Sequence, residues 1–233
     1  DGGGAVTLES GGTDDGSDFN DVVIAKTGGG SVTVQTDDWD VDGTVTVSSG
    51  SLILTSSSTI FGGATVASGA SLGGTSTVNG AVAVQDGGGI TPGVGGVGTL
   101  SINGNLTMAA TSSSTWTLEL GTSSDQITVG GDLTLDGVLE VSDSGGFGAG
   151  TYTIATYTGS LNDQTMTVGT LPAGFVASID TATANQVQLL VASEPSVSLT
   201  ATDASAAEPG TDTGTWTLSL SRAVPVDTVG GLG

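Results

Sequence analysis

One short pattern recurs through the middle of the chain: a glycine opens a run in which small or β-branched residues alternate with apolar ones. Copies begin at Gly43, Gly63, Gly80, Gly104 and Gly131, so the spacing is near 20 at first and increases along the chain. A period of two predicts strands with one face in a core and the other in water. The longer repeat predicts a stack of coils, each burying its apolar face against its neighbours. The positions predicted to point inward are Val45, Val47, Val82, Val84, Leu106, Leu133 and Leu135.

The composition agrees with a thin, repetitive core. The chain has 233 residues, of which 36% are hydrophobic but only 4% aromatic, and mean hydropathy is +0.23. This is too apolar for a disordered chain, despite 41 glycines. No segment has the 3.6-residue stripe of a helix, so the prediction is an all-β fold. At about 20 residues a coil, residues 1–192 would form about nine or ten coils.

The charge is strongly one-sided. Two basic residues, Lys26 and Arg222, stand against 24 acidic ones, and the formal net charge is −22. No basic stripe exists to displace phosphate counterions, so nucleic acid is excluded as a partner, as is docking on an anionic membrane. The chain lacks cysteine, which excludes disulfides and thiolate metal sites. It also lacks an apolar run long enough for a helical membrane span.

The sequence divides into three parts. Residues 1–42 are predicted to form a cap with entry strands, residues 43–192 the β-solenoid, and residues 193–233 a separate segment that follows the boundary signal Glu194-Pro195. This last segment holds two predicted strands, Ser196–Ala201 and Thr215–Ser221. Isolated pairs of strands are marginal in water, so we expect the second strand to seek a partner sheet in a neighbouring copy. The side chains predicted to form that joint are Trp216, Leu218 and Leu220.

Residues 43–192 resemble the β-helical passenger region of autotransporter-type bacterial surface proteins. The motifs that carry the likeness are Asn79-Gly-Ala-Val-Ala-Val, Ile90-Thr-Pro-Gly, Gly98-Thr-Leu-Ser-Ile-Asn-Gly-Asn-Leu-Thr, Ser124-Asp-Gln-Ile-Thr-Val-Gly-Gly-Asp-Leu-Thr-Leu-Asp-Gly, Gly150-Thr-Tyr-Thr-Ile-Ala-Thr-Tyr and Leu171-Pro-Ala-Gly-Phe. The resemblance implies a right-handed parallel β-helix, secretion to the cell surface, and a structural or adhesive role.

Residues 194–227 are similar to the opening of a Calx-β domain, an extracellular β-sandwich module. The carriers are Val197-Ser-Leu-Thr-Ala, Ala207-Glu-Pro-Gly and Thr213-Gly-Thr-Trp-Thr-Leu-Ser-Leu-Ser-Arg. The resemblance implies a short β-sandwich-like strand segment and makes Glu208 a candidate Ca²⁺ ligand. A complete domain of this kind needs more strands than this segment supplies.

A second candidate calcium site lies just before the first repeat. Asp38, Asp40 and Asp42 alternate and are followed by Gly43, as in the first half of a Ca²⁺-binding loop. The twelfth position of such a loop should be Glu, and here it is Ser49. The alternative interpretation is a strand whose solvent face carries the three aspartates. Three further aspartates, near predicted coil corners, are expected to bond their own backbone: Asp125, Asp132 and Asp136.

The residues argue against an enzyme. Polysaccharide lyases and hydrolases with a β-helical fold need a basic residue beside bound calcium or a pair of carboxylates on one face. Lys26 and Arg222 are far apart in sequence, and the chain contains no histidine for acid–base work near neutral pH. Glu119 and Glu140 are the best carboxylate pair, but their apolar neighbours indicate outward positions on two strands.

The sequence therefore predicts an extracellular structural protein that forms or extends a bacterial cell-surface filament, sheath or stalk by head-to-tail self-association. The alternative is an adhesin that recognises glycans or a host surface. A remote alternative is a polysaccharide-active β-helix enzyme. No cofactor is predicted apart from the candidate Ca²⁺.

Overall fold

The alternating sequence forms short strands throughout. A computed structural model describes residues 6–8, 19–34, 40–55, 58–109, 113–202 and 215–221. Within these ranges the regular structure is all β, without a helix, which confirms the predicted all-β class. The chain divides into two compact units, Asp1–Ala192 and Ser193–Gly233.

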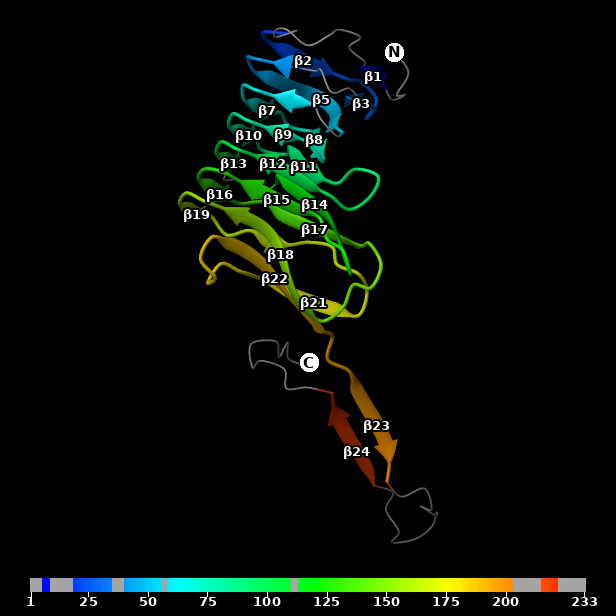
Figure 1. The fold of residues 1–233 in the computed structure, drawn as a ribbon. Coiled ribbons are helices and arrows are strands. Elements are labelled where there is room, and N and C mark those ends of the chain that lie inside the picture. The colour runs from blue at the N-terminus through cyan, green and yellow to red at the C-terminus, as the bar shows by residue number, and fades with distance from the viewer. Residues whose placement is uncertain are drawn as a thin grey trace. The chain divides into compact units, whose positions relative to one another are not determined.

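The first unit is a stack of parallel strands on three faces (Figure 1). The first face contains β2 (Val22–Ala25), the first half of β5 (Val45–Leu54), β7 (Ala64–Val66), β10 (Val82–Val84), β13 (Leu106–Met108), β16 (Leu133–Leu135) and β19 (Leu161–Asp163). The second face contains β1 (Val6–Leu8), β3 (Ser31–Val34), the second half of β5, β8 (Ala70–Gly74), β11 (Gly89–Pro92), β14 (Thr115–Leu120), β17 (Val138–Asp143) and β20 (Thr167–Val168). The third face contains β4 (Asp40–Val41), β6 (Thr59–Ile60), β9 (Thr77–Val78), β12 (Thr99–Ile102), β15 (Gln126–Val129) and β18 (Gly150–Tyr157).

The chain visits the three faces in the same order in each coil. After β5 it passes through β6, β7 and β8, and this cycle of third, first and second face continues to β20. Each strand therefore pairs with its counterpart one coil earlier and one coil later, and the backbone N–H and C=O groups are satisfied between coils. This parallel, curled pairing is compatible with a solenoid, in which a coil contacts only its neighbours.

The coils lengthen along the chain. On the third face Thr59 pairs with Thr77, and Thr77 pairs in turn with Ser101, which lies farther along the sequence from its partner. The separation grows again in the later pair of Ile127 with Ala155. The described part of the second face accordingly has eight parallel strands, fewer than the nine or ten coils expected from a constant period.

A column of glycines marks the corner where the third face turns into the first. A Cβ added at Gly62 would lie 1.7 Å from the Gly43 carbonyl oxygen, and one at Gly80 would lie 2.2 Å from that of Gly62. The same crowding recurs between Gly104 and Gly80. The backbones of successive coils are therefore too close here for any side chain, which explains why glycine recurs at this corner. In the second copy the column residue is Gly62, one position before the Gly63 that the repeat predicted. The corner column consists of Gly43, Gly62, Gly80, Gly104, Gly131 and Gly159.

The core runs along the inside of the stack. All seven residues predicted to point inward are buried, with at most 2% of their surface exposed. On the second face the inward column includes Leu72, Ile90 and Trp116, whose places follow from the register of β8, β11 and β14. Trp116 is fully buried, and its indole Nε1 donates to the Asp136 carbonyl oxygen at 3.1 Å. This contact satisfies the polar atom that burying tryptophan would otherwise leave unpaired.

The pairing changes direction at the end of the stack. Strand β18 pairs in parallel with β15 but antiparallel with β22 (Gln186–Ser193), which is followed in the sheet order by β21 (Phe175–Asp180). Three aromatic rings of this region pack together: Phe147 stacks on Tyr152 with centroids 5.3 Å apart and meets Phe175 edge-on at 5.2 Å. The parallel stack thus ends next to an antiparallel strand pair and an aromatic cluster.

The second unit contains a two-stranded antiparallel ribbon of β23 (Val197–Ala201) and β24 (Trp216–Leu220). Val197 lies opposite Leu220, Leu199 opposite Leu218, and Ala201 opposite Trp216. Directly opposed residues share one face of a ribbon, so the apolar side chains lie together and the serines and threonines lie on the other face.

Candidate ligand-binding groove

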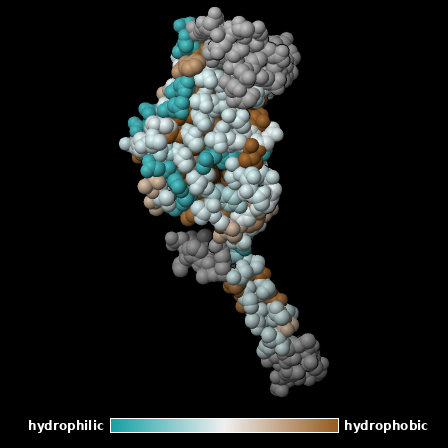
Figure 2. Space-filling view, viewed as in Figure 1, coloured by the Kyte–Doolittle hydropathy of each residue, from teal (hydrophilic) through white to brown (hydrophobic). Residues whose placement is uncertain are grey.

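The outer surface of the stack is made largely of small hydroxyl side chains. On the third face five of them stand in register, one per coil, and Thr128 donates from Oγ1 to Ser101 Oγ at 3.1 Å. Figure 2 shows the result as a surface of mostly pale, intermediate hydropathy over the stack. Such a surface offers many neutral donors and acceptors. The third-face hydroxyl column consists of Thr59, Thr77, Ser101, Thr128 and Thr156.

The acidic side chains sit mainly at corners and fasten the backbone. Asp21 accepts a hydrogen bond from the Thr44 amide at 2.8 Å, one coil later, and Asp132 accepts one from the Ser160 amide at 2.7 Å. Of the three aspartates expected to bond their own turn, Asp136 does so by accepting from Gly137 at 2.5 Å. Asp132 instead reaches the next coil. Many of the carboxylates therefore connect coils rather than forming an acidic binding face.

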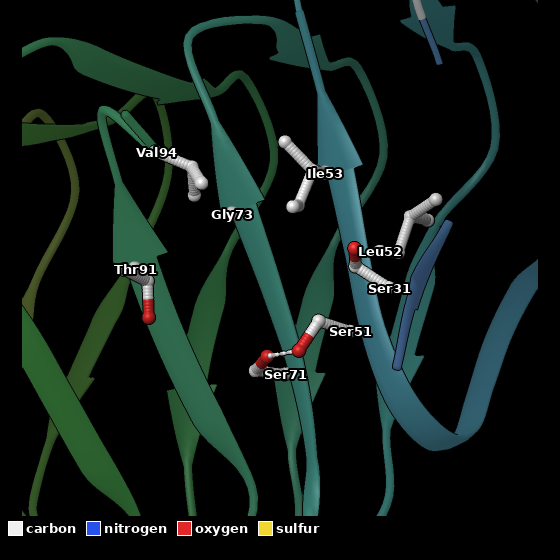
Figure 3. Close-up of a pocket in the computed structure, with 8 residues that line it drawn as sticks. All are labelled: Ser31, Ser51, Leu52, Ile53, Ser71, Gly73, Thr91 and Val94. Carbon is white, nitrogen blue, oxygen red and sulfur yellow. Dashed lines mark hydrogen bonds between the residues drawn. The ribbon is translucent and has the colours of Figure 1, made fainter. Parts of the chain in front are cut away.

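The second face carries a recess lined by eight uncharged residues (Figure 3). One side is a row of hydroxyls: Ser31 pairs with Ser51, and Ser51 pairs with Ser71. Ser71 donates from its Oγ to Ser51 Oγ at 2.7 Å. The strand spacing of about 4.8 Å sets the separation between successive positions in the row. We call this recess the serine groove; its lining residues are Ser31, Ser51, Leu52, Ile53, Ser71, Gly73, Thr91 and Val94.

The other side of the serine groove is aliphatic. Ile53, Gly73 and Thr91 share one outward column, and Figure 3 shows Gly73 between the side chains of Ile53 and Val94. Because Gly73 has no side chain, a cavity of about 190 Å³ remains between them. An alanine Cβ at Gly73 would lie 2.2 Å from the Thr91 carbonyl oxygen, so the backbone itself keeps this space open.

Val94 is held over the groove by a glycine-rich loop that follows β11. The loop needs left-handed backbone at Gly93 and Gly95, whose φ angles are 64° and 85°. Its start is tied to the stack by the Gly93 amide, which donates to the Gly74 carbonyl oxygen at 3.0 Å. The glycine run that follows β11 therefore forms a loop and not a further strand.

Asp125 secures the other end of this loop from the next coil. Its carboxylate accepts hydrogen bonds from the amides of Gly98 and Glu119, both at 2.7 Å. The residue is buried, with 1% of its surface exposed. Burial raises the pKa of the Asp125 carboxyl above its ordinary value, the two amide hydrogen bonds oppose that rise, and the nearby Glu119 charge adds to it. Asp125 thus bonds the backbone beside its own turn, as predicted, and also fastens a loop one coil away.

The predicted calcium ligands are only partly within the described residues. Asp40 begins β4 and Asp42 is exposed, whereas Asp38 and Glu208 lie outside the described ranges. In the part of the chain that is described, no three acidic side chains converge as metal ligands would. The two calcium sites stay predictions.

The predicted joint residues lie on an exposed face. Trp216, Leu218 and Leu220 are 65%, 63% and 51% exposed, and Val197 and Leu199 beside them are equally open. These five side chains form the apolar face of the ribbon. The predicted common face of β24 is therefore present, whereas its role in assembly stays a prediction.

The carboxylates considered for catalysis do not face each other. In the β14–β17 ladder, Glu140 lies opposite Thr117, and Glu119 lies opposite Ser142. Glu140 accepts the Thr170 amide at 2.7 Å and so serves the backbone of the next coil. Lys26 is buried in the first coils, and Arg222 lies outside the described residues. The two glutamates are thus diagonal neighbours on the outer side of this ladder, and the Glu140 carboxylate is bonded to a backbone amide.

The sequence reasoning missed the serine groove. Its signal in the sequence is a missing outward side chain. Two residues after the outward Ser71 comes Gly73, whereas the equivalent positions carry Ile53 in β5 and Thr91 in β11. The missing side chain, together with the glycine run from Gly93, marks the coil where this recess forms.

A comparison with characterised proteins finds a bacterial surface protein. Over 118 aligned residues, which cover 47% of this chain, the sequence is 43% identical to the adhesin BmaC autotransporter of Brucella suis biovar 1 (strain 1330). The chain spans about 3% of the length of that relative. No protein-family model matches the chain. Among the described residues, no helix has the length and apolar character needed to cross a membrane.

Proposed function

We propose that this chain is part of the exposed, secreted region of an autotransporter-type adhesin, and that its coils close into a right-handed parallel β-helix. The observation that carries the proposal is the similarity to the adhesin BmaC autotransporter, at 43% identity over 118 residues. The three-faced parallel stack supports it, since a solenoid extends a surface outward from a cell using few residue types. The role is adhesive and not enzymatic.

Contact with a surface would be made by the outer faces of the coils. They present rows of neutral hydroxyls, whereas many carboxylates are turned to backbone amides at corners. Hydroxyl rows can exchange water for the hydroxyls of a glycan or the amides of a protein at little cost. The net charge of −22 favours neutral or cationic partners over anionic ones.

Adhesion can be tested with beads coated with the full chain and applied to mammalian cell layers and to an array of neutral and acidic glycans. Beads coated with a charge-matched acidic protein are the control. The expected result is retention of the chain-coated beads above that control on at least one surface. Retention equal to the control on every surface, or release of reducing sugar from a polysaccharide, would contradict the proposal.

A second candidate function, joining of copies, is favoured by the apolar face of β23–β24. Five of its side chains are more than half exposed and share one face of the ribbon. The matching surface is therefore the same face of another copy, and mutual burial would stabilise two ribbons that are marginal alone. A contact between identical faces is isologous and closes on itself, so joining in this way gives dimers. The head-to-tail filament that the sequence predicted would need a second, different surface.

Deleting residues 194–233 tests the joining function. The full chain is expected to form dimers whose fraction increases with salt, because screening weakens the repulsion between copies. The truncated chain should stay monomeric in analytical ultracentrifugation. Equal association of both proteins would place the joint elsewhere, and a full chain that stays monomeric at high salt would contradict the joining function.

A further inference from the structure

The geometry points to the serine groove as a binding subsite for a single ring of a neutral saccharide. This inference rests on the proposed adhesive function and specifies where on the stack the recognition takes place. Three features of the groove carry it: the paired hydroxyls, the aliphatic wall, and the size and charge of the space between them.

The hydroxyl side is arranged to bind a polyol. Each serine hydroxyl has one donor and two acceptor lone pairs. Because Ser71 donates to Ser51, the Ser51 proton is directed elsewhere and lone pairs on both oxygens stay available. The strands repeat about every 4.8 Å along the stack, but the two serine oxygens lie only 2.7 Å apart. The pair therefore presents a compact group of donors and acceptors to a ring hydroxyl.

The aliphatic side suits the C–H face of the same ring. Ile53 is half-buried and Val94 is 41% exposed, so their methyl groups offer apolar surface that a ring would remove from water. The space over Gly73 separates the two side chains. The loop that carries Val94 is held at both ends, by the Gly74 carbonyl oxygen and by the Asp125 carboxylate, so little conformational entropy is lost on binding.

Size and charge narrow the ligand class. The cavity of about 190 Å³ is smaller than the roughly 300–1,000 Å³ typical of sites for drug-sized ligands. It therefore accommodates one ring and not an extended oligosaccharide. None of the eight lining residues is charged, and the field of a chain with net charge −22 disfavours anionic sugars. The expected ligand is a neutral pyranoside, bound in the millimolar range as a single-ring contact.

The test is a titration of the isotope-labelled full chain followed by amide NMR shifts. The probes are methyl β-D-glucopyranoside, methyl β-D-galactopyranoside and methyl β-D-glucuronide. At least one neutral glycoside should shift the amides of Ser51, Ser71, Gly73 and Val94, and the glucuronide should not. Absence of shifts with both neutral glycosides up to tens of millimolar overturns the inference, as do equal shifts with the glucuronide.

Two double variants make the test specific. Ser51→Ala with Ser71→Ala removes the paired hydroxyls of the groove and should weaken binding about tenfold or more. Ser198→Ala with Ser219→Ala removes an opposed pair of exposed serines on the β23–β24 ribbon, which belongs to the second unit and not to the coils, and should leave the affinity unchanged. If both variants lose binding equally, the contact is a general property of exposed hydroxyls and the groove is not a site.

A further variant separates failure of the groove from failure of the adhesive function. Val94→Asp places a charge on the exposed loop without disturbing a buried residue, and it should abolish the neutral-glycoside shifts. If wild-type beads and Val94→Asp beads adhere equally, the adhesive function stands and the inference that the groove carries the recognition is overturned. If wild-type beads fail to adhere while the glycoside binds, the groove stands and the adhesive function is wrong.

Discussion

Leu133 and Thr134 are adjacent in β16 and show how strictly the two faces of a coil differ. Leu133 is fully buried and stacks between Leu106 and Leu161 of the neighbouring coils. Thr134 pairs with Thr107 on the outer surface and stays partly exposed. The difference arises from strand geometry alone, because successive side chains point to opposite sides of the sheet.

Replacement of each residue by alanine should reflect this difference. Leu133→Ala leaves a cavity in a narrow core and should lower the free energy of unfolding by about 2–5 kcal/mol. Thr134→Ala removes only a surface hydroxyl and should cost less than about 1 kcal/mol. Denaturant unfolding followed by circular dichroism measures both. Equal losses would mean that the register of β16 is wrong.

Asp125 gives the stability of the fold a pH dependence of its own. Its pKa is raised above 3.8, chiefly by burial, so the folded chain binds the proton more tightly than the unfolded chain. This contribution is fully present below the ordinary pKa and is lost as pH rises through the folded value. The stability advantage of wild type over Asp125→Asn should therefore be larger near about pH 3 than near about pH 7.

Comparing the two proteins at each pH removes the contribution of acids that lie far from Asp125. Unfolding midpoints in urea at several pH values supply the measurement. An advantage of wild type that grows as pH rises would contradict the raised pKa of Asp125.

The predicted calcium loop leads to a separate prediction about the effect of calcium on stability. If Asp38, Asp40 and Asp42 bind Ca²⁺, bound ion stabilises the folded chain by about 2.7 kcal/mol at a free concentration about 100 times the Kd. Chelation should then lower the melting temperature, and Asp40→Asn should remove that sensitivity. Identical melting of wild type with calcium and with chelator would leave the three aspartates as a solvated strand face.

Among the elements, the glycine corner is where the chain tolerates least change. Gly80→Ala would place a Cβ 2.2 Å from the Gly62 carbonyl oxygen, in the contact between two coils. We expect a loss of about 1–3 kcal/mol or more, because the backbone of one coil must shift. Gly150→Ala is the matched control, since no heavy atom lies within 4 Å of its added Cβ. Similar thermal melting of the two variants would show that the corner is not tightly packed.

The elements could largely be predicted from the sequence, and the groove could not. Alternation located the inward residues of β10, β13 and β16 because a strand's period depends only on local geometry. The serine groove depends on a loop held at Gly98 by Asp125, which belongs to the following coil. Contacts of this kind are set by the register between coils, and coils of unequal length conceal that register in a single sequence.

At the scale of the whole molecule, the same unequal lengths explain why the described residues form fewer coils than a constant period predicts. A constant period predicts nine or ten coils, whereas partner residues on the third face lie farther apart in the Ile127–Ala155 pair than in the Thr59–Thr77 pair. The antiparallel pair of β18 and β22 also uses residues that the simple repeat assigned to further coils. Neither the longer coils nor the antiparallel pair changes the hydrophobic periodicity, because apolar and polar residues alternate along the strands in both cases.

The growth in coil length gives the stack a mechanical signature. When the stack is pulled from its two ends, it should unfold one coil at a time, since each coil is bonded only to its neighbours. The early coil between Thr59 and Thr77 releases about 6 nm of contour length, and the late coil between Ile127 and Ala155 about 9–10 nm. Force spectroscopy on the full chain should record a sawtooth whose steps grow between these two sizes. A single rupture of the whole stack would show that all the coils unfold together. A surface protein that behaved in this way would give way abruptly instead of lengthening under load.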